Sequence, residues 1–120
     1  MMAIPNIVSV SSIYGTTYVA VLTTTLTTTI VTAASEKVLK INVIRASNIT
    51  SSDATVTFDV EVAGTHKIIA NAITVPANSS VDIIDKNSSF YLQETDLLRG
   101  GASAGTTVDV MVSYEILDDA

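Results

Sequence analysis

Two pairs of carboxylates in this sequence have a spacing that acid and base chemistry can use. Asp59 with Glu61, and Asp109 with Glu115, could in principle form the acid and base pair of a glycosidase. Both pairs alternate with apolar residues, however, and such alternation is typical of the outward face of any half-buried sheet. A solvated strand face therefore explains these carboxylates better than a catalytic site does.

The single histidine, His66, follows a glycine-containing turn and stands beside Lys67. No partner recurs at strand spacing to make it a catalytic base or a metal ligand, so we expect an exposed turn residue. No Gly-x-Ser-x-Gly elbow or phosphate-binding glycine loop occurs either. We therefore expect no enzyme, no cofactor and no metal. Four loop carboxylates could hold calcium, but no EF-hand spacing accompanies them, so we expect them to stay hydrated: Asp82, Asp85, Glu94 and Asp96.

Composition restricts the class of partner. The chain has 120 residues, of which 48% are apolar and only 15% are charged, and its mean hydropathy is +0.47. A soluble domain usually has about a quarter of its residues charged, so part of this surface is expected to contact other protein chains. A small, tightly packed monomer is the alternative. The net charge of −6 repels a phosphate backbone, so nucleic acid is not an expected partner.

The compartment is constrained by what the sequence lacks. The longest apolar run, Tyr18–Leu22, is far shorter than the ~20 residues of a membrane-spanning helix. Met1–Pro5 has no basic segment followed by an apolar core, so no secretory signal is predicted. The chain contains no cysteine for disulfides or for zinc. We therefore expect neither a membrane partner nor secretion, and maturation in a cytosol.

The clearest strand signal is the stretch Thr106–Leu117, in which apolar and polar residues alternate. Side chains alternate across a strand, so one row is predicted to face the core while Asp109, Met111, Ser113 and Glu115 face outward. A row of this length needs a second sheet to cover it. The inward row is Val108, Val110, Val112, Tyr114 and Ile116.

Other segments show the same alternation. Thr55–Val62 is predicted to point Val56, Phe58, Val60 and Val62 inward and Asp59 and Glu61 outward. In Val38–Ile49 the apolar phase changes around Arg45, which indicates a β-bulge or a corner between sheets. Gly100–Gly105 is predicted as a loose link. Further strands are expected at Tyr18–Thr24, Thr28–Thr32, His66–Val75, Val81–Ile84, Phe90–Gln93 and Leu97–Arg99.

These strands predict an all-β fold, an antiparallel β-sandwich of jelly-roll or immunoglobulin-like type with about eight strands and no substantial helix. A single sandwich domain is expected over residues 16–120. Residues 1–15 are predicted to form an extended arm, because their apolar residues show no strand period. Such an arm docks either on its own domain or, as we favour, on a neighbour. Its interface residues would be Ile4, Ile7, Val8 and Val10.

The order of these segments resembles that of small virion structural proteins of tailed bacteriophages, particularly phages of marine and cyanobacterial hosts. The resemblance covers Thr23–Ile116 and depends on strand and turn pattern. Where such families often carry glycine before the aspartate of the Glu94-x-Asp96 turn, this chain has Thr95. The segments concerned are Thr23–Thr32, Val38–Asn48, Thr55–Val62, Ile73–Ser80, Tyr91–Arg99 and Val112–Glu115.

The resemblance implies a non-enzymatic β-sandwich subunit of a virion, assembled in the host cytoplasm. The expected role is that of a capsid decoration, or cement, protein that binds the major capsid protein and forms a homo-oligomer such as a trimer. A neck or tail component is the alternative within the virion. A carbohydrate-binding module is the alternative from another class, although aromatic residues make up only 5% of the chain and tryptophan is absent.

Overall fold

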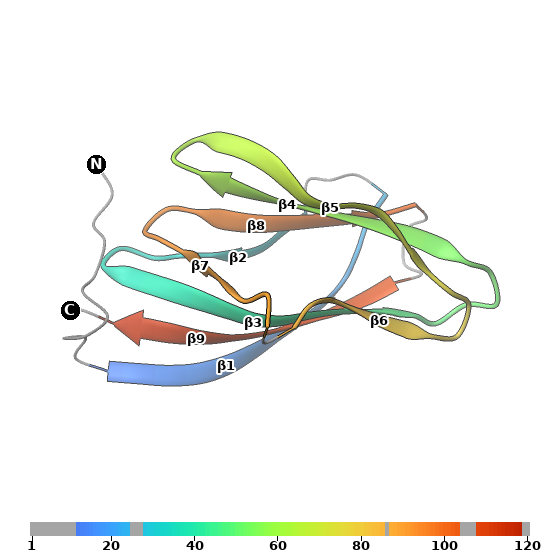
Figure 1. Cartoon of the computed structure of the whole chain (residues 1–120), viewed down its shortest axis with the longest axis horizontal. Coiled ribbons are helices and arrows are strands. Elements are labelled where there is room, and N and C mark those ends of the chain that lie inside the picture. The colour runs from blue at the N-terminus through green and yellow to red at the C-terminus, as the bar shows by residue number, and fades with distance from the viewer. Residues whose placement is uncertain (1–11, 25–27, 86, 104–107, 119–120) are drawn as a thin grey trace.

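The computed structural model describes residues 12–24, 28–85, 87–103 and 108–118, and this part of the chain forms nine antiparallel strands in two sheets (Figure 1). No helix in it is long and apolar enough to cross a membrane. The expectation of an antiparallel β-sandwich is confirmed. The strands are β1 (Ser12–Val21), β2 (Thr28–Thr32), β3 (Lys37–Asn48), β4 (Ala54–Val62), β5 (Thr65–Val75), β6 (Ser80–Ile84), β7 (Phe90–Leu92), β8 (Leu97–Ala102) and β9 (Val108–Asp118).

The strand order identifies the type of sandwich. Sheet A has the order β1-β9-β3-β6, and the short β7 also pairs with β3; sheet B has the order β2-β8-β4-β5. Apart from the β4–β5 hairpin and the β6–β7 link, each connection carries the chain from one sheet to the other. With β7 set aside, two four-stranded sheets connected in this way form a jelly roll.

The core lies between the two sheets and is built from the alternating residues of β3, β4, β8 and β9. Val108, Val110 and Val112 are almost fully buried, and Tyr114 and Ile116 are partly buried against the same core. The predicted facing of the last strand is therefore confirmed. Outside the sandwich core, Leu117 is also buried beside its cross-strand partner Val38.

The phase change in β3 is a β-bulge. Ile41 pairs with Tyr114 and Val43 pairs with Ser113, so Asn42 is the extra residue. The sequence had indicated the irregularity around Arg45, and the bulge lies three residues before that position. The pairing of β3 with β6 also shifts, between Ile44 and Arg45. The strand stays within sheet A, so the alternative of a corner between sheets is wrong.

Strand β4 differs from its predicted burial at two positions. Val56 and Phe58 are buried as expected, but Val62 is 44% exposed because the pairing of β4 with β8 ends one residue earlier, at Glu61. Asp59 was expected in solvent and is instead only 2% exposed.

Two segment boundaries also differ. The first strand begins at Ser12 rather than at Tyr18, so residues 12–15, assigned to the arm from the sequence, belong to sheet A. Gly100 and Gly101 are part of β8 rather than of a loose link, and both are buried. A glycine is needed at position 100 because a Cβ there would stand 2.8 Å from the ring of Phe58.

Candidate functional site

The arm residues singled out from the sequence, Ile4, Ile7, Val8 and Val10, lie outside the described residues. The structure does, however, place the other chemically notable side chains. These fall into a charged cluster on the outer face of sheet B, a set of loop carboxylates, and apolar side chains on the edge strands.

The charged cluster is positioned by the hairpin between β4 and β5. Its two turn residues, Ala63 and Gly64, have φ angles of 52° and 83°. Two consecutive positive φ values define a type I′ turn, which matches the twist of the flanking strands. This two-residue turn fixes the register, so that Glu61 lies directly across from His66.

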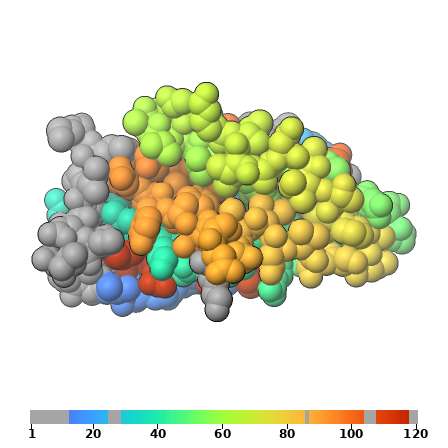
Figure 2. Space-filling model, viewed as in Figure 1, coloured from blue at the N-terminus to red at the C-terminus, as the bar shows by residue number. Residues whose placement is uncertain are grey.

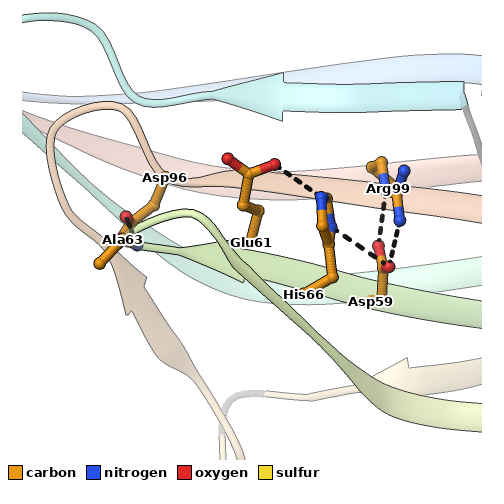
Figure 3. Close-up of polar contacts among 6 residues, drawn as sticks. All are labelled: Asp59, Glu61, Ala63, His66, Asp96 and Arg99. Atoms are coloured by element: carbon orange, nitrogen blue, oxygen red, sulfur yellow. Dashed lines mark hydrogen bonds and ion pairs between the residues drawn. The ribbon is translucent and has the colours of Figure 1, made fainter.

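Figure 3 shows His66 between two carboxylates. Its Nε2 lies 2.8 Å from Oε1 of Glu61, and its Nδ1 lies 3.6 Å from Oδ2 of Asp59. Asp59 also accepts two hydrogen bonds from Arg99 of β8, from Nε at 3.0 Å and from Nη2 at 2.6 Å. The cross-strand pairing of Asp59 with Arg99 produces this fork-like contact.

The cluster is arranged for stability rather than for proton transfer. A histidine in a nucleophilic triad uses one nitrogen for a carboxylate and the other for the nucleophile. Here both nitrogens of His66 face carboxylates. The hydrogen bond to Asp59 raises the pKa of Arg99, with partial burial opposing it, so Arg99 is a permanent cation beside a buried anion. His66 is exposed, as expected, but it belongs to strand β5 rather than to the turn and it has two carboxylate partners.

Asp96 connects the β7–β8 turn to the tip of the β4–β5 hairpin. It is 1% exposed, and its two oxygens accept hydrogen bonds from the backbone N–H of Ala63 at 3.3 Å and of Gln93 at 3.0 Å. Figure 3 shows its side chain next to Ala63. The expectation that Asp96 stays hydrated is wrong, because backbone donors have replaced its water.

The other three carboxylates expected in loops have different partners, and Asp82 lies in strand β6. Asp82 forms an ion pair with Arg45 at 2.7 Å, and Asp85 accepts the N–H of Asn87 in its own turn. Glu94 accepts hydrogen bonds from the Ser35–Glu36 turn. Within the described residues, no group of three or more His, Asp or Glu side chains could hold a metal ion.

The carboxylates of β9 also have local roles. Glu115 is partly buried and accepts a hydrogen bond from the amide of Asn42 at 3.1 Å, which ties it to the bulge in β3. Asp109 is partly buried on the outer face of sheet A, near the end of β1. Their outward facing was predicted correctly, but neither is fully solvated.

Exposed apolar side chains gather on the edge strand β1 and on the β4–β5 hairpin, which forms one edge of sheet B. The β1 edge carries Ile13, Tyr14, Val19 and Val21, of which Val19 is 71% exposed. The hairpin surface is formed by Val62, Ile68, Ile69 and Ile73 of the β4–β5 hairpin. Figure 2 shows this hairpin along the upper margin of the molecule, and β1 lies at the lower margin in Figure 1. These two surfaces are the candidate interaction sites.

Part of this site could have been found from the sequence. The two-residue turn Ala63-Gly64 between alternating strands already implies that Glu61 and His66 face each other. The contact of Asp59 with Arg99 requires the order of strands in sheet B, which no local pattern gives. The β1 edge was missed because residues 12–15 had been assigned to the arm.

Comparisons with known proteins do not assign this chain to a family. No protein-family model matches the chain, and no curated protein matches it either.

Proposed function

We propose that this chain is a non-enzymatic structural subunit of a tailed-phage virion, and that it serves as a capsid decoration protein bound to the major capsid protein. The observation that carries the proposal is the concentration of exposed apolar side chains at two places, the β1 edge and the hairpin surface. Apolar groups gathered in this way on an otherwise well-packed domain mark surfaces for other proteins.

The position of the two surfaces fits a cementing role. The β1 edge belongs to sheet A and the hairpin surface to sheet B, and they lie at opposite margins of the molecule (Figure 1). A subunit with contacts on opposite margins can hold two neighbours at once. The jelly-roll order agrees with the resemblance to virion proteins, since viral capsid domains use this architecture, although fold analogy alone does not define function.

The test is the copy number of this chain in purified particles, measured by quantitative mass spectrometry against the major capsid protein. A number comparable to that of the capsid protein is the expected result. A number that matches a single ring would instead assign the chain to the neck or tail. Absence from particles would refute a virion role, and a thermal shift with oligosaccharides would then favour a carbohydrate-binding module.

The arm gives a second test. Because strand β1 begins at Ser12, removal of residues 1–11 leaves every described strand intact. We expect the shortened chain to keep its unfolding midpoint and to bind particles more weakly. A lost midpoint would show that the arm belongs to the core. The matched control is Ile68→Ser on the hairpin surface, which keeps the arm and tests the other contact.

A further inference from the structure

The edges of the two sheets are not equally protected against pairing with another chain. An exposed edge strand offers free N–H and C=O groups, and soluble proteins usually block such edges with charge, proline, bulges or short strands. Comparing the edges of this sandwich therefore identifies the strand that is prepared to accept a partner.

Three of the edges carry such protection. Strand β5 has Lys67, shifts in its register with β4, and a positive φ of 51° at Ala72. Strand β2 has only five residues and an irregular register. The far edge of sheet A is divided between the short strands β6 and β7, and Asp82 of β6 is paired with Arg45.

Strand β1 has none of these features. Its ten residues contain no charged side chain and no proline, and they pair with β9 from Ser12 to Val21 without a register shift. Among the described residues, no strand pairs with the other side of β1, which is the lowest ribbon in Figure 1. Every second residue of a strand directs its backbone groups to one side, so β1 has a hydrogen-bonding edge that no other described strand uses.

Gly15 gives a second, independent indication of a partner. A Cβ at this position would meet nothing within 4 Å, and its backbone conformation does not require glycine. Glycine in the interior of a strand weakens it, and it often marks a place where another backbone comes close. The monomer gives no reason for glycine at position 15, whereas a neighbouring strand would.

We propose that β1 pairs antiparallel with β1 of a second copy of this chain, forming a two-fold dimer with one continuous sheet. Electrostatics permits pairing with a second copy, because an uncharged strand brings no like charges together when it meets itself, although the chain has a net charge of −6. Self-complementary side chains favour this partner, because the strand holds both the exposed aliphatic residues and the bare Gly15 that would lie opposite one of them. The pairing does not depend on the role in a virion.

The apolar side chains select the register. Residues directly opposite in an antiparallel pair point to the same face, so a symmetric pair must be centred on one residue. Centring on Thr17 places Ile13 opposite Val21 of the second copy and Val19 opposite Gly15, which covers all three exposed aliphatic residues of β1. Centring on Thr16 or Tyr18 leaves one of the three without an opposite residue in β1.

The outer surface fits this register. Ile13 of the second copy would lie over Val21, at the rim of a depression of about 360 Å³ that Val19, Val21 and Met111 help to line. Val19 would cover the bare backbone of Gly15, as large side chains opposite edge glycines do in designed sheets. Because the contact is two-fold, it cannot by itself close the trimer expected from the resemblance.

Cysteine cross-linking tests the register, because the chain has no cysteine of its own. In the proposed dimer the Cα atoms of the two Thr17 residues lie roughly 4.5–5.5 Å apart, within the range of disulfides. Oxidised Thr17→Cys should therefore form a disulfide dimer. Val19→Cys is the matched control, since its two copies would lie roughly 14 Å apart and should stay unlinked. Mixing Gly15→Cys with Val19→Cys should give the mixed disulfide.

Light scattering of the full chain tests the assembly itself. The unmodified chain should have twice the monomer mass of 12.6 kDa. Thr17 is exposed, and Thr17→Lys would place two positive charges at the two-fold axis, so this variant should have the monomer mass with an unchanged circular dichroism spectrum. A monomeric or trimeric unmodified chain would overturn the proposal. Equal cross-linking of Thr17→Cys and Val19→Cys, or a dimer dissolved by Ile68→Lys but not by Thr17→Lys, would also overturn it.

Discussion

The same substitution at two glycines should have opposite effects on stability. At Gly100, a Cβ would stand 2.8 Å from Cε1 and 3.0 Å from Cδ1 of Phe58, and 2.9 Å from Cδ1 of Ile30. The side chain of Ile30 ends in a flexible methyl group, but the ring of Phe58 is fully buried and directly opposite Gly100. At Gly15, the added Cβ meets nothing within 4 Å.

The magnitudes follow from two opposing effects. Replacing glycine by alanine reduces the freedom of the unfolded chain and stabilises the fold by about 0.5–1 kcal/mol. Overpacking a core costs about 1–3 kcal/mol. Within a single chain only the first effect acts at Gly15, so in the monomeric Thr17→Lys background Gly15→Ala is expected to stabilise by about 0.5 kcal/mol. At Gly100 the second effect is larger, so Gly100→Ala is expected to destabilise by about 1–2 kcal/mol.

Urea unfolding followed by circular dichroism measures both free energies, at one protein concentration because a dimer makes stability depend on concentration. A double-mutant cycle identifies the clash. Phe58→Leu alone should cost about 1–2 kcal/mol for the cavity it leaves. The double variant with Gly100→Ala should lose roughly 1 kcal/mol less unfolding free energy than the sum of the two single losses. Equal effects of Gly15→Ala and Gly100→Ala, or an additive cycle, would refute this reasoning.

Three further outcomes are expected. Val110→Asp should lower the free energy of unfolding by about 4 kcal/mol, because it buries an unpaired charge. Asp109→Ala, on the outward face, should change this free energy by no more than about 0.5 kcal/mol, and equal losses in urea would contradict the facing of β9. Asn48→Ala should cost about 2 kcal/mol, because the buried amide donates to the carbonyls of Ser52 and Val75; an unchanged midpoint would contradict it. The hydrogen bond from Arg45 lowers the pKa of Asp82 below 3.8, against the effect of burial. The pair therefore stabilises the fold fully above pH 3.8, and this contribution is lost as the pH falls through the lower pKa of Asp82 in the folded state. Arg45→Met should raise the pKa of Asp82 toward 3.8 in a carboxylate NMR titration, and an unmoved titration would speak against the pair.

The local alternation of apolar and polar residues was sufficient to predict side-chain facing wherever one face of a strand meets the core and the other meets solvent. In β9 the alternation from Val108 to Ile116 correctly predicted which side meets the core, because a shift of one residue would turn every apolar side chain to solvent. The all-β class and the approximate number of strands followed from several such segments together.

Pattern failed where the neighbouring strand decides the environment. Val62 continues the apolar row of β4, but β8 no longer pairs at that position, so the side chain is exposed. Asp59 continues the polar row and is nevertheless buried, because Arg99 and His66 cover it. In both cases the sequence gives the direction of the side chain, but not what lies beside it.

Residue composition led to wrong strand boundaries at two other places. Gly100 and Gly101 have the chemistry of a loop, yet both pair with β4 as part of β8, and at Gly100 the ring of Phe58 needs the space that a side chain would fill. Ser12 and Gly15 looked like an arm, but the unbroken pairing with β9 makes them strand. The candidate interaction surface on β1 was hidden by the same error.

The place of β9 in sheet A has a consequence for how the protein folds as it is made. This strand is the last of the nine along the chain, yet it lies between β1 and β3 and joins them. Ser12 pairs with Asp118, so the first strand must wait for the ribosome to deliver residues from the other end of the described chain. Pairings between such distant segments form slowly. Until β9 emerges, the uncharged β1 has neither of its edges occupied, and nascent chains should need protection from aggregation during that interval.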